Sequence, residues 1–177
     1  MKYWKIPNTI HPTWAIDLSQ LNDFTEILDV MKSLGIIKYV YSFIFRSGII
    51  KYGISADNSR MYGERIYRQA GHLDGWSRKL QGPSGSDMRI IADDYFAKTG
   101  IRLNRVDMII VVEDLTQVPS NAVADPARPC RELESKRIQE HIEEYGEKPI
   151  GNKNDESHIP KKSYVSVTDW FNNFEEE

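Results

Sequence analysis

The sequence has a single cysteine, Cys130, among 177 residues. One thiol cannot build a framework of disulfides within the chain or supply a cysteine-rich zinc site. Cys130 also has no histidine close to it in the sequence, which argues against a cysteine nucleophile. A chain without disulfides suits a reducing compartment, so we expect a cytoplasmic protein.

Long apolar runs are also absent from the sequence. No stretch approaches the ~20 apolar residues of a membrane-spanning helix, and the first residues lack the apolar core of a signal peptide. The CysXXCys, HisGluXXHis and GlyXGlyXXGly patterns do not occur, and the four histidines lack the spacing of zinc ligands. We therefore expect no membrane partner and no histidine zinc site.

The composition is typical of one globular domain spanning residues 1–177. Hydrophobic residues make up 40% of the sequence and charged residues 28%. A chain of this length buries a substantial core without covalent staples.

The net charge of −3 is unevenly divided along the chain. Residues 38–105 hold twelve Lys and Arg against six Asp and Glu, so this stretch is basic although the chain is acidic. A polyanion responds to local charge within roughly 8 Å at physiological salt. This pattern favours a nucleic-acid partner, and a salt-bridged surface without a ligand is the alternative.

The first part of the chain divides into two segments. Residues 1–15 carry three aromatic side chains and two prolines, which predicts an extended arm packed against the body of the protein. Apolar residues recur at helical spacing from Leu21 to Leu34, and Gly35 is a natural stop. This pattern predicts an amphipathic helix whose apolar stripe faces the core.

A β-hairpin is predicted over residues 38–55. Two runs rich in aromatic and β-branched residues are separated by the polar turn of residues 46–48. Because antiparallel partners fold back, residues equally distant from the turn lie side by side. Tyr39, Tyr41 and Lys51 should therefore gather at the open end of the hairpin, as a reactive cluster or as an ordinary half-buried strand pair.

A basic helix is expected after the hairpin, over residues 61–73. Arg65, Arg68 and His72 step by three and four positions, so a continuous helix places them on one face. That face either lies beside Lys51 or is simply solvated.

The loop of residues 75–86 is basic at first and rich in glycine later. It lacks the P-loop pattern, so we interpret it as a connector in which Arg78 and Lys79 contact nucleic acid. A helix that ends near Lys98 and a buried strand over residues 106–112 come next. The strand adds a third member to the predicted sheet.

A strongly charged helix is predicted over residues 130–145. Glu134 lies next to its apolar stripe, one turn before Ile138, so its carboxylate can point toward a buried edge. Most glutamates in such a helix are solvated, which is the alternative interpretation. Together these segments predict an α+β fold in α/β/α layers, with a small, mostly antiparallel three-stranded sheet flanked by helices.

The order of these segments and two hairpin motifs resemble the GIY-YIG nuclease superfamily. Residues 39–41 resemble the first motif with its leading glycine replaced, which makes Tyr41 the motif tyrosine. Residues 51–55 resemble the second motif, with Gly53 in the place of its glycine. Lys51 stands where most members have tyrosine, as in a branch of the superfamily that includes a type II restriction enzyme.

Two of the site residues that the resemblance implies have competing candidates. Lys51 and Tyr52 point to opposite faces of a regular strand, so only one of them can serve the site. The family places an arginine on the helix after the second motif. Arg60 has about the expected spacing, whereas Arg65 sits better inside the helix and is preferred.

The later part of the chain carries the rest of the resemblance. Residues 133–138 resemble the family's late helix, which implies that Glu134 binds a metal ion, Mg²⁺ or another divalent cation such as Mn²⁺. Residues 149–152 resemble the asparagine-containing segment that closes the module. The nuclease module would then span residues 38–152.

The resemblance implies hydrolysis of a DNA phosphodiester bond. Tyr41 would take a proton from the attacking water. A free phenol titrates near pH ~10, and the ammonium of Lys51 would bring this value down. The catalytic arginine would bind two phosphate oxygens, and the ion held by Glu134 would stabilise the leaving oxygen.

The resemblance leaves the biological substrate open. A sequence-specific endonuclease of restriction or phage type, a repair or recombination nuclease for branched DNA, and a non-catalytic DNA-binding module all fit it. The host would be a bacterial or phage-infected cell, and a palindromic target would favour a homodimer. Specificity would reside in the arm and helix of residues 1–37, the glycine-rich loop of residues 75–86 and the C-terminal extension of residues 153–177. Four residues outside the catalytic centre would contact the DNA: Arg68, His72, Arg78 and Lys79.

Overall fold

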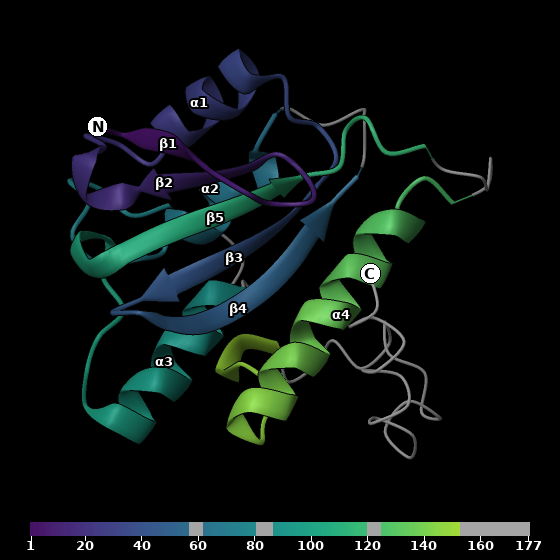
Figure 1. Ribbon diagram of the computed structural model, residues 1–177. Helices are drawn as coiled ribbons and strands as arrows, with labels where there is room; N and C mark the ends of the chain where they lie inside the picture. Colours follow the sequence, from purple (N-terminus) through teal and green to yellow (C-terminus); the bar gives the residue numbers. More distant parts are fainter. Residues whose placement is uncertain (57–61, 81–86, 120–124, 153–177) are drawn as a thin grey trace.

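The computed structural model describes residues 1–56, 62–80, 87–119 and 125–152. The fold is α+β, with a five-stranded antiparallel sheet of strand order β1-β2-β5-β3-β4 and helices on both of its faces (Figure 1). The strands are β1 (Tyr3–Ile6), β2 (Thr13–Asp17), β3 (Tyr39–Phe45), β4 (Gly48–Ser55) and β5 (Met108–Asp114). The helices are α1 (Glu26–Leu34), α2 (Glu64–Ala70), α3 (Asp87–Thr99) and α4 (Arg128–Tyr145), with short 3₁₀ segments η1 (Leu18–Gln20), η2 (Arg105–Asp107) and η3 (Ile150–Asn152).

The sheet is larger than the three strands that the sequence predicts. Strands β3, β4 and β5 are the predicted members, and β1 and β2 extend the sheet beyond β5. Strand β2 pairs with β5 from Thr13 opposite Glu113 to Asp17 opposite Ile109. The segment expected as an extended arm is therefore a hairpin of the sheet, and that expectation is wrong.

The prolines that suggested an irregular arm lie outside these two strands. Pro7 follows β1 and Pro12 precedes β2, so neither removes a hydrogen-bond donor from the ladder. Strands of four and five residues are too short for alternation of apolar and polar residues to reveal them reliably.

Two predicted helices are shorter in the structure than in the sequence pattern. Helix α1 begins later than predicted, at Glu26, and ends at Gly35, whose φ of 68° forms a left-handed cap. Helix α2 ends at Ala70, and the backbone N–H of His72 bonds only three residues back, as in a 3₁₀ turn. His72 therefore lies beyond the helix. The sequence predicted that His72 shares a helix face with Arg65, and that prediction is wrong. None of the helices in the described residues is long and apolar enough to span a membrane.

The two faces of the β3–β4 hairpin are buried against different helices. On one face, the alternate aromatic residues of β3 from Tyr39 to Phe45 pack in the main core with α1, α2 and α3. On the other face, Val40 and Tyr52 pack with Ile138 of α4. Figure 1 shows α4 running beside this hairpin, next to β4, with α2 and α3 on the other side of the two strands. Full burial of one large apolar side chain contributes about 1.5–3 kcal/mol, so both layers hold the hairpin in place.

The β3–β4 turn sets the register of the hairpin. Arg46 and Ser47 have positive φ angles of 49° and 71°, the geometry of two-residue turns that match the twist of the strands. The pairing then shifts between Ile44 and Phe43. Because of this bulge, residues beyond it pair one position away from where counting outward from the turn would place them.

The outer edge of β4 is closed by η3. The Asn152 side chain accepts a hydrogen bond from the Tyr52 N–H at 2.8 Å and donates one to the Tyr52 carbonyl at 2.9 Å. Asn152 is fully buried, so these bonds replace the pair that a neighbouring strand would make. η3 also contacts α3, which places it between the edge strand and that helix.

Candidate active site

Tyr41 and Gly53 face each other across the hairpin. Directly paired residues project from the same face of a sheet, and the Tyr41 phenol lies over the glycine. A Cβ atom on residue 53 would overlap the ring and its hydroxyl oxygen. The glycine of the second motif is therefore needed because Tyr41 fills the space that a side chain would occupy.

Lys51, rather than Tyr52, shares the face of Tyr41. Lys51 pairs with Phe43, two residues along β3 from Tyr41, so Lys51 and Tyr41 are diagonal neighbours on the core face. Tyr52 pairs with Ser42 and projects to the other face, where burial raises its pKa. Of the two candidates, only Lys51 is positioned to act on Tyr41.

Tyr39 lies at the open end of the hairpin, next to Tyr41 on the same face. The two ring centroids are 6.1 Å apart. Burial and the neighbouring Tyr41 raise the pKa of the Tyr39 hydroxyl, and the positive charge of Arg65 partly offsets the rise. The three residues expected as one cluster at the open end thus form a row along the hairpin, because the register places Lys51 nearer the turn.

Glu134 approaches the open end of the hairpin from α4, on the other face of the sheet. It lies one turn after Cys130 and is 2% exposed. Burial raises the pKa of Cys130 to about 12, with the charge of Lys38 opposing the rise and that of Glu134 adding to it. Cys130 in turn contributes to the raised pKa of the Tyr39 hydroxyl. These couplings place the start of α4 beside the hairpin end, and they make Cys130 an unreactive buried thiol.

Glu134 offers one carboxylate to a metal ion. Among the described residues, no three His, Cys, Asp or Glu side chains gather as a ligand cluster. Mg²⁺ commonly keeps several waters and takes one or two carboxylates together with substrate phosphates. A single carboxylate therefore fits an ion that is bound jointly with a phosphate substrate, and fits poorly an ion bound by the protein alone.

The two candidates for the catalytic arginine differ in what the structure describes. Arg65 is exposed on α2 and acts electrostatically on Tyr39. Arg60 lies outside the described residues, as does the whole extension of residues 153–177. Arg65 is thus the arginine that the described residues bring to the open end of the hairpin.

Two of the predicted DNA-binding residues lie on the open surface. Arg68 forms an ion pair with Glu64 at 3.2 Å. Arg78 forms one with Asp23 at 3.3 Å and lies 4.7 Å above the centre of the Phe24 ring. Both arginine side chains remain more than half exposed, so their guanidinium groups stay available to a polyanion.

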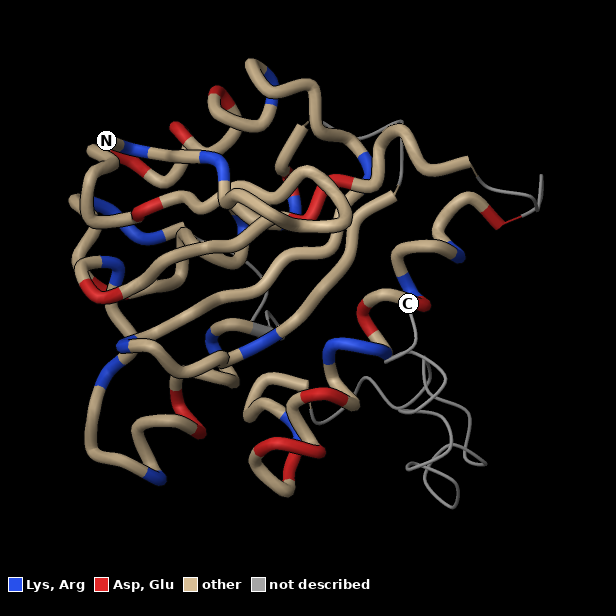
Figure 2. The backbone as a smooth tube through the Cα atoms, viewed as in Figure 1, with Lys and Arg blue, Asp and Glu red and all other residues tan. Residues whose placement is uncertain are grey.

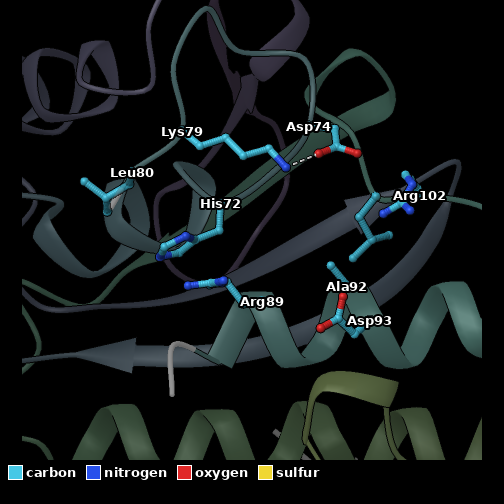
Figure 3. Close-up of a pocket in the computed structure, with 9 residues that line it drawn as sticks. His72, Asp74, Lys79, Leu80, Arg89, Ala92, Asp93 and Arg102 are labelled. Carbon is cyan, nitrogen blue, oxygen red and sulfur yellow. Dashed lines mark ion pairs between the residues drawn. The ribbon is translucent and has the colours of Figure 1, made fainter. Parts of the chain in front are cut away.

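The other two predicted DNA-binding residues line a cavity. His72 and Lys79 border a space of about 310 Å³ together with Arg89 and Arg102 (Figure 3). The sequence counted Arg89 and Arg102 only as part of the basic stretch, because nothing local to them shows that the fold brings them next to His72. A tertiary contact across more than fifteen residues has no local signal.

The C-terminal part of α4 differs in charge from α2, which carries Arg65 and Arg68 against Glu64. The last two turns of α4 carry Glu140, Glu143 and Glu144 and no Lys or Arg (Figure 2). A polyanion is repelled from such a surface. Positive side chains are more frequent in α2 and the loop after it, at Arg65, Arg68, Arg78 and Lys79.

The likeness to the GIY-YIG superfamily rests on short motifs and on their order in the chain. The structure adds the positions of Tyr41, Lys51, Gly53 and Asn152 around one edge strand. Comparison of the chain with models of protein families, with curated proteins and with solved structures finds no match.

Proposed function

We propose that this protein is a metal-dependent DNA endonuclease of the GIY-YIG type. The observation that carries the proposal is the placement of Tyr41 and Lys51 as diagonal neighbours on one face of the hairpin, with the phenol over Gly53. A phenol beside an ammonium group is suited to proton transfer. Packing alone does not favour a lysine that is only 5% exposed, because burying an ammonium is costly.

In the proposed reaction, a water oxygen attacks the phosphorus of a DNA phosphodiester while the bond to the leaving 3′ oxygen breaks. Tyr41, as the phenolate, accepts the proton of the water, and Lys51 favours the phenolate. Arg65 stabilises the negative charge that develops on the phosphate oxygens. Glu134 would hold the Mg²⁺ ion, which would supply electrostatic stabilisation of the leaving oxygen.

Three variants test this assignment: Tyr41→Phe, Lys51→Met and Glu134→Gln. Each is given supercoiled plasmid DNA with Mg²⁺, and we expect each to cleave at least about 100-fold more slowly than the wild type. Circular dichroism checks that each variant remains folded. Lys98→Gln, which removes an exposed charge from α3, is the control and should cleave at the wild-type rate.

Two results would contradict parts of the mechanism. Full cleavage by Glu134→Gln would remove the metal assignment. A wild-type rate that stays constant between about pH 6 and pH 9 would exclude Tyr41 as the base. Salt-dependent DNA binding without cleavage by the wild type, with Mg²⁺ or Mn²⁺ present, would indicate a non-catalytic DNA-binding module instead.

A further inference from the structure

A polar cavity lies between α3 and the segment that follows α2, apart from the residues assigned to catalysis. Its volume of about 310 Å³ is at the lower end of the range for ligand sites, ~300–1,000 Å³. Three apolar residues complete its walls. The ionisable side chains that line it come from α3 and from the segments that follow α2 and α3: His72, Asp74, Lys79, Arg89, Asp93 and Arg102.

Backbone hydrogen bonds hold the walls of the cavity. Leu80 N donates to the Gly71 carbonyl at 2.9 Å, which fixes the loop that carries Lys79. The backbone of Asp74 forms two hydrogen bonds with the chain beyond α3. Its N–H donates to the Leu103 carbonyl at 3.2 Å, and its carbonyl accepts from the Arg105 N–H at 2.9 Å. The charged groups are thus presented on a frame that is already ordered, which lowers the cost of binding a ligand.

The charged side chains are unevenly distributed within the cavity. Figure 3 shows His72 and Arg89 next to each other at one end, and Asp74 with Arg102 toward the other. Lys79 reaches across and forms an ion pair with Asp74. Burial lowers the pKa of His72, and the charges of Arg89 and Lys79 lower it further. The charges acting on the imidazole are therefore positive. The carboxylate of Asp74 is engaged by Lys79, and Asp93, the other carboxylate of the lining, lies toward the Arg102 end (Figure 3).

We propose that the His72–Arg89 end of this cavity binds a phosphate group. Arg89 can present two parallel N–H donors to phosphate oxygens, and a ring N–H of His72 can add a third. The remaining volume accommodates the sugar attached to the phosphate. The source of the phosphate group rests on the proposed nuclease function. The group would be a backbone phosphate of the DNA, distinct from the one that is cleaved. A free nucleotide carries the same group, and the experiments separate the two sources.

Helix α3 links this cavity to the candidate active site. Arg89 lines the cavity, whereas Ile91 packs toward η3 and Lys51. A Cβ atom on Gly151 would lie 2.8 Å from the Lys51 Cβ and 2.9 Å from the Ile91 Cδ1, so these three residues meet closely. A phosphate bound at Arg89 is therefore fixed relative to Lys51 by one rigid helix, which would set the register of the DNA strand on the catalytic face.

The first experiment follows the His72 imidazole by NMR in the full-length protein. Inorganic phosphate, a nucleoside monophosphate or a short DNA duplex is added without a divalent cation, so that no cleavage occurs. We expect saturable shifts at His72 and a titration midpoint moved to higher pH, because a bound anion favours the imidazolium. The other three histidines of the chain serve as internal references. Absence of a response to all three compounds would overturn the proposal.

The second experiment compares Arg89→Gln with Lys98→Gln in duplex binding. Each variant removes one positive charge from an exposed position of α3, and of the two residues only Arg89 lines the cavity. We expect Arg89→Gln to weaken binding about tenfold and to reduce the slope of log affinity against log salt by about 1. Lys98→Gln should stay within about twofold of the wild type. Equal losses in both variants would contradict a specific phosphate site.

The outcomes distinguish this proposal from the nuclease function. Cleavage by the wild type with no response of His72 to DNA or phosphate overturns the phosphate site and leaves the nuclease intact. A response of His72 to DNA without cleavage supports the site and removes the nuclease. A response to the nucleoside monophosphate but not to DNA supports phosphate binding and assigns the source to a free nucleotide.

Discussion

Gly53 has only a hydrogen atom where other residues carry a Cβ atom, and the phenol of Tyr41 occupies that space. The glycine lets the ring lie flat across the partner strand, with its hydroxyl close to the β4 backbone. The same contact fixes where the hydroxyl stands relative to Lys51, two positions along the strand. A residue with no side chain therefore positions the two groups that we assign to proton transfer.

This contact predicts a large effect of a small substitution. Gly53→Ala should lower the free energy of unfolding by about 1–3 kcal/mol, the usual cost of overpacking a core, because the Tyr41 ring must move. Gly48→Ala is the matched control on the same strand: its Cβ would meet only the Phe45 carbonyl oxygen, at an ordinary 3.5 Å. Its effect should stay within about 0.5 kcal/mol. Urea unfolding measures both, and equal values would contradict the close approach of Tyr41 to residue 53.

At the scale of elements, the residue pattern within one segment predicts the features that depend on that segment alone. The aromatic and β-branched runs of β3 and β4 identify the hairpin, and the period of two shows that only one of Lys51 and Tyr52 can share the face of Tyr41. The register beyond the bulge is what selects Lys51. The bulge between Phe43 and Ile44 depends on how the turn is twisted, so counting from the turn placed Lys51 too near the open end. Helix α4 followed from a stripe of helical period, whereas the position of Glu134 beside that stripe left open whether its side chain is buried or solvated, and the structure shows it buried.

What the sequence did not reveal depends on contacts between distant segments. Strand β2 becomes a strand by pairing with β5, and its five residues carry no pattern strong enough to show this alone. Arg89 lines the cavity with His72 only because α3 folds back against the turn after α2. Such contacts are set by tertiary packing, which overrides local preference.

The closed edge of β4 also predicts a measurable cost. Asn152→Ala removes both partners of the Tyr52 backbone at a buried edge, and we expect a loss of about 2–4 kcal/mol in the free energy of unfolding. Asn152→Asp keeps the acceptor but places a buried carboxylate against the Tyr52 carbonyl oxygen, so its effect should be at least as large as that of the alanine variant. Asn22→Ala, at an exposed position, should change stability by less than about 0.5 kcal/mol. Equal effects at positions 152 and 22 would show that Asn152 does not hold the edge.

At the scale of the whole molecule, the N-terminal hairpin is part of the structural core. Ile16 and Leu18 are fully buried. The Arg105 guanidinium donates to the carbonyl oxygens of Leu18 and Leu21, both at 3.1 Å. These contacts tie the first strands to the segment that enters β5. The hairpin therefore supports the sheet from the side opposite to the candidate site.

Removal of residues 1–20 should consequently abolish cooperative folding. The truncation deletes two strands and exposes the edge of β5 along its length, a loss that a domain stabilised by about 5–15 kcal/mol cannot absorb. Near-ultraviolet circular dichroism and thermal unfolding measure the outcome, with Lys5→Ala, an exposed change on β1, as the control. A truncated protein that unfolds cooperatively at the wild-type temperature would contradict this role.

The pairing of Thr13 with Glu113 also has a consequence during protein synthesis. A ribosome that adds ~5–20 residues per second needs roughly 5–20 s to reach β5 after β2 has been made. An isolated hairpin is marginally stable in water, so the aromatic strands at the start of the nascent chain stay accessible to chaperones over that interval. The backbone of Tyr52 at the edge of β4 likewise gains its partner Asn152 only after another 100 residues have been made. The edge of β4 is therefore completed only when synthesis has passed Asn152.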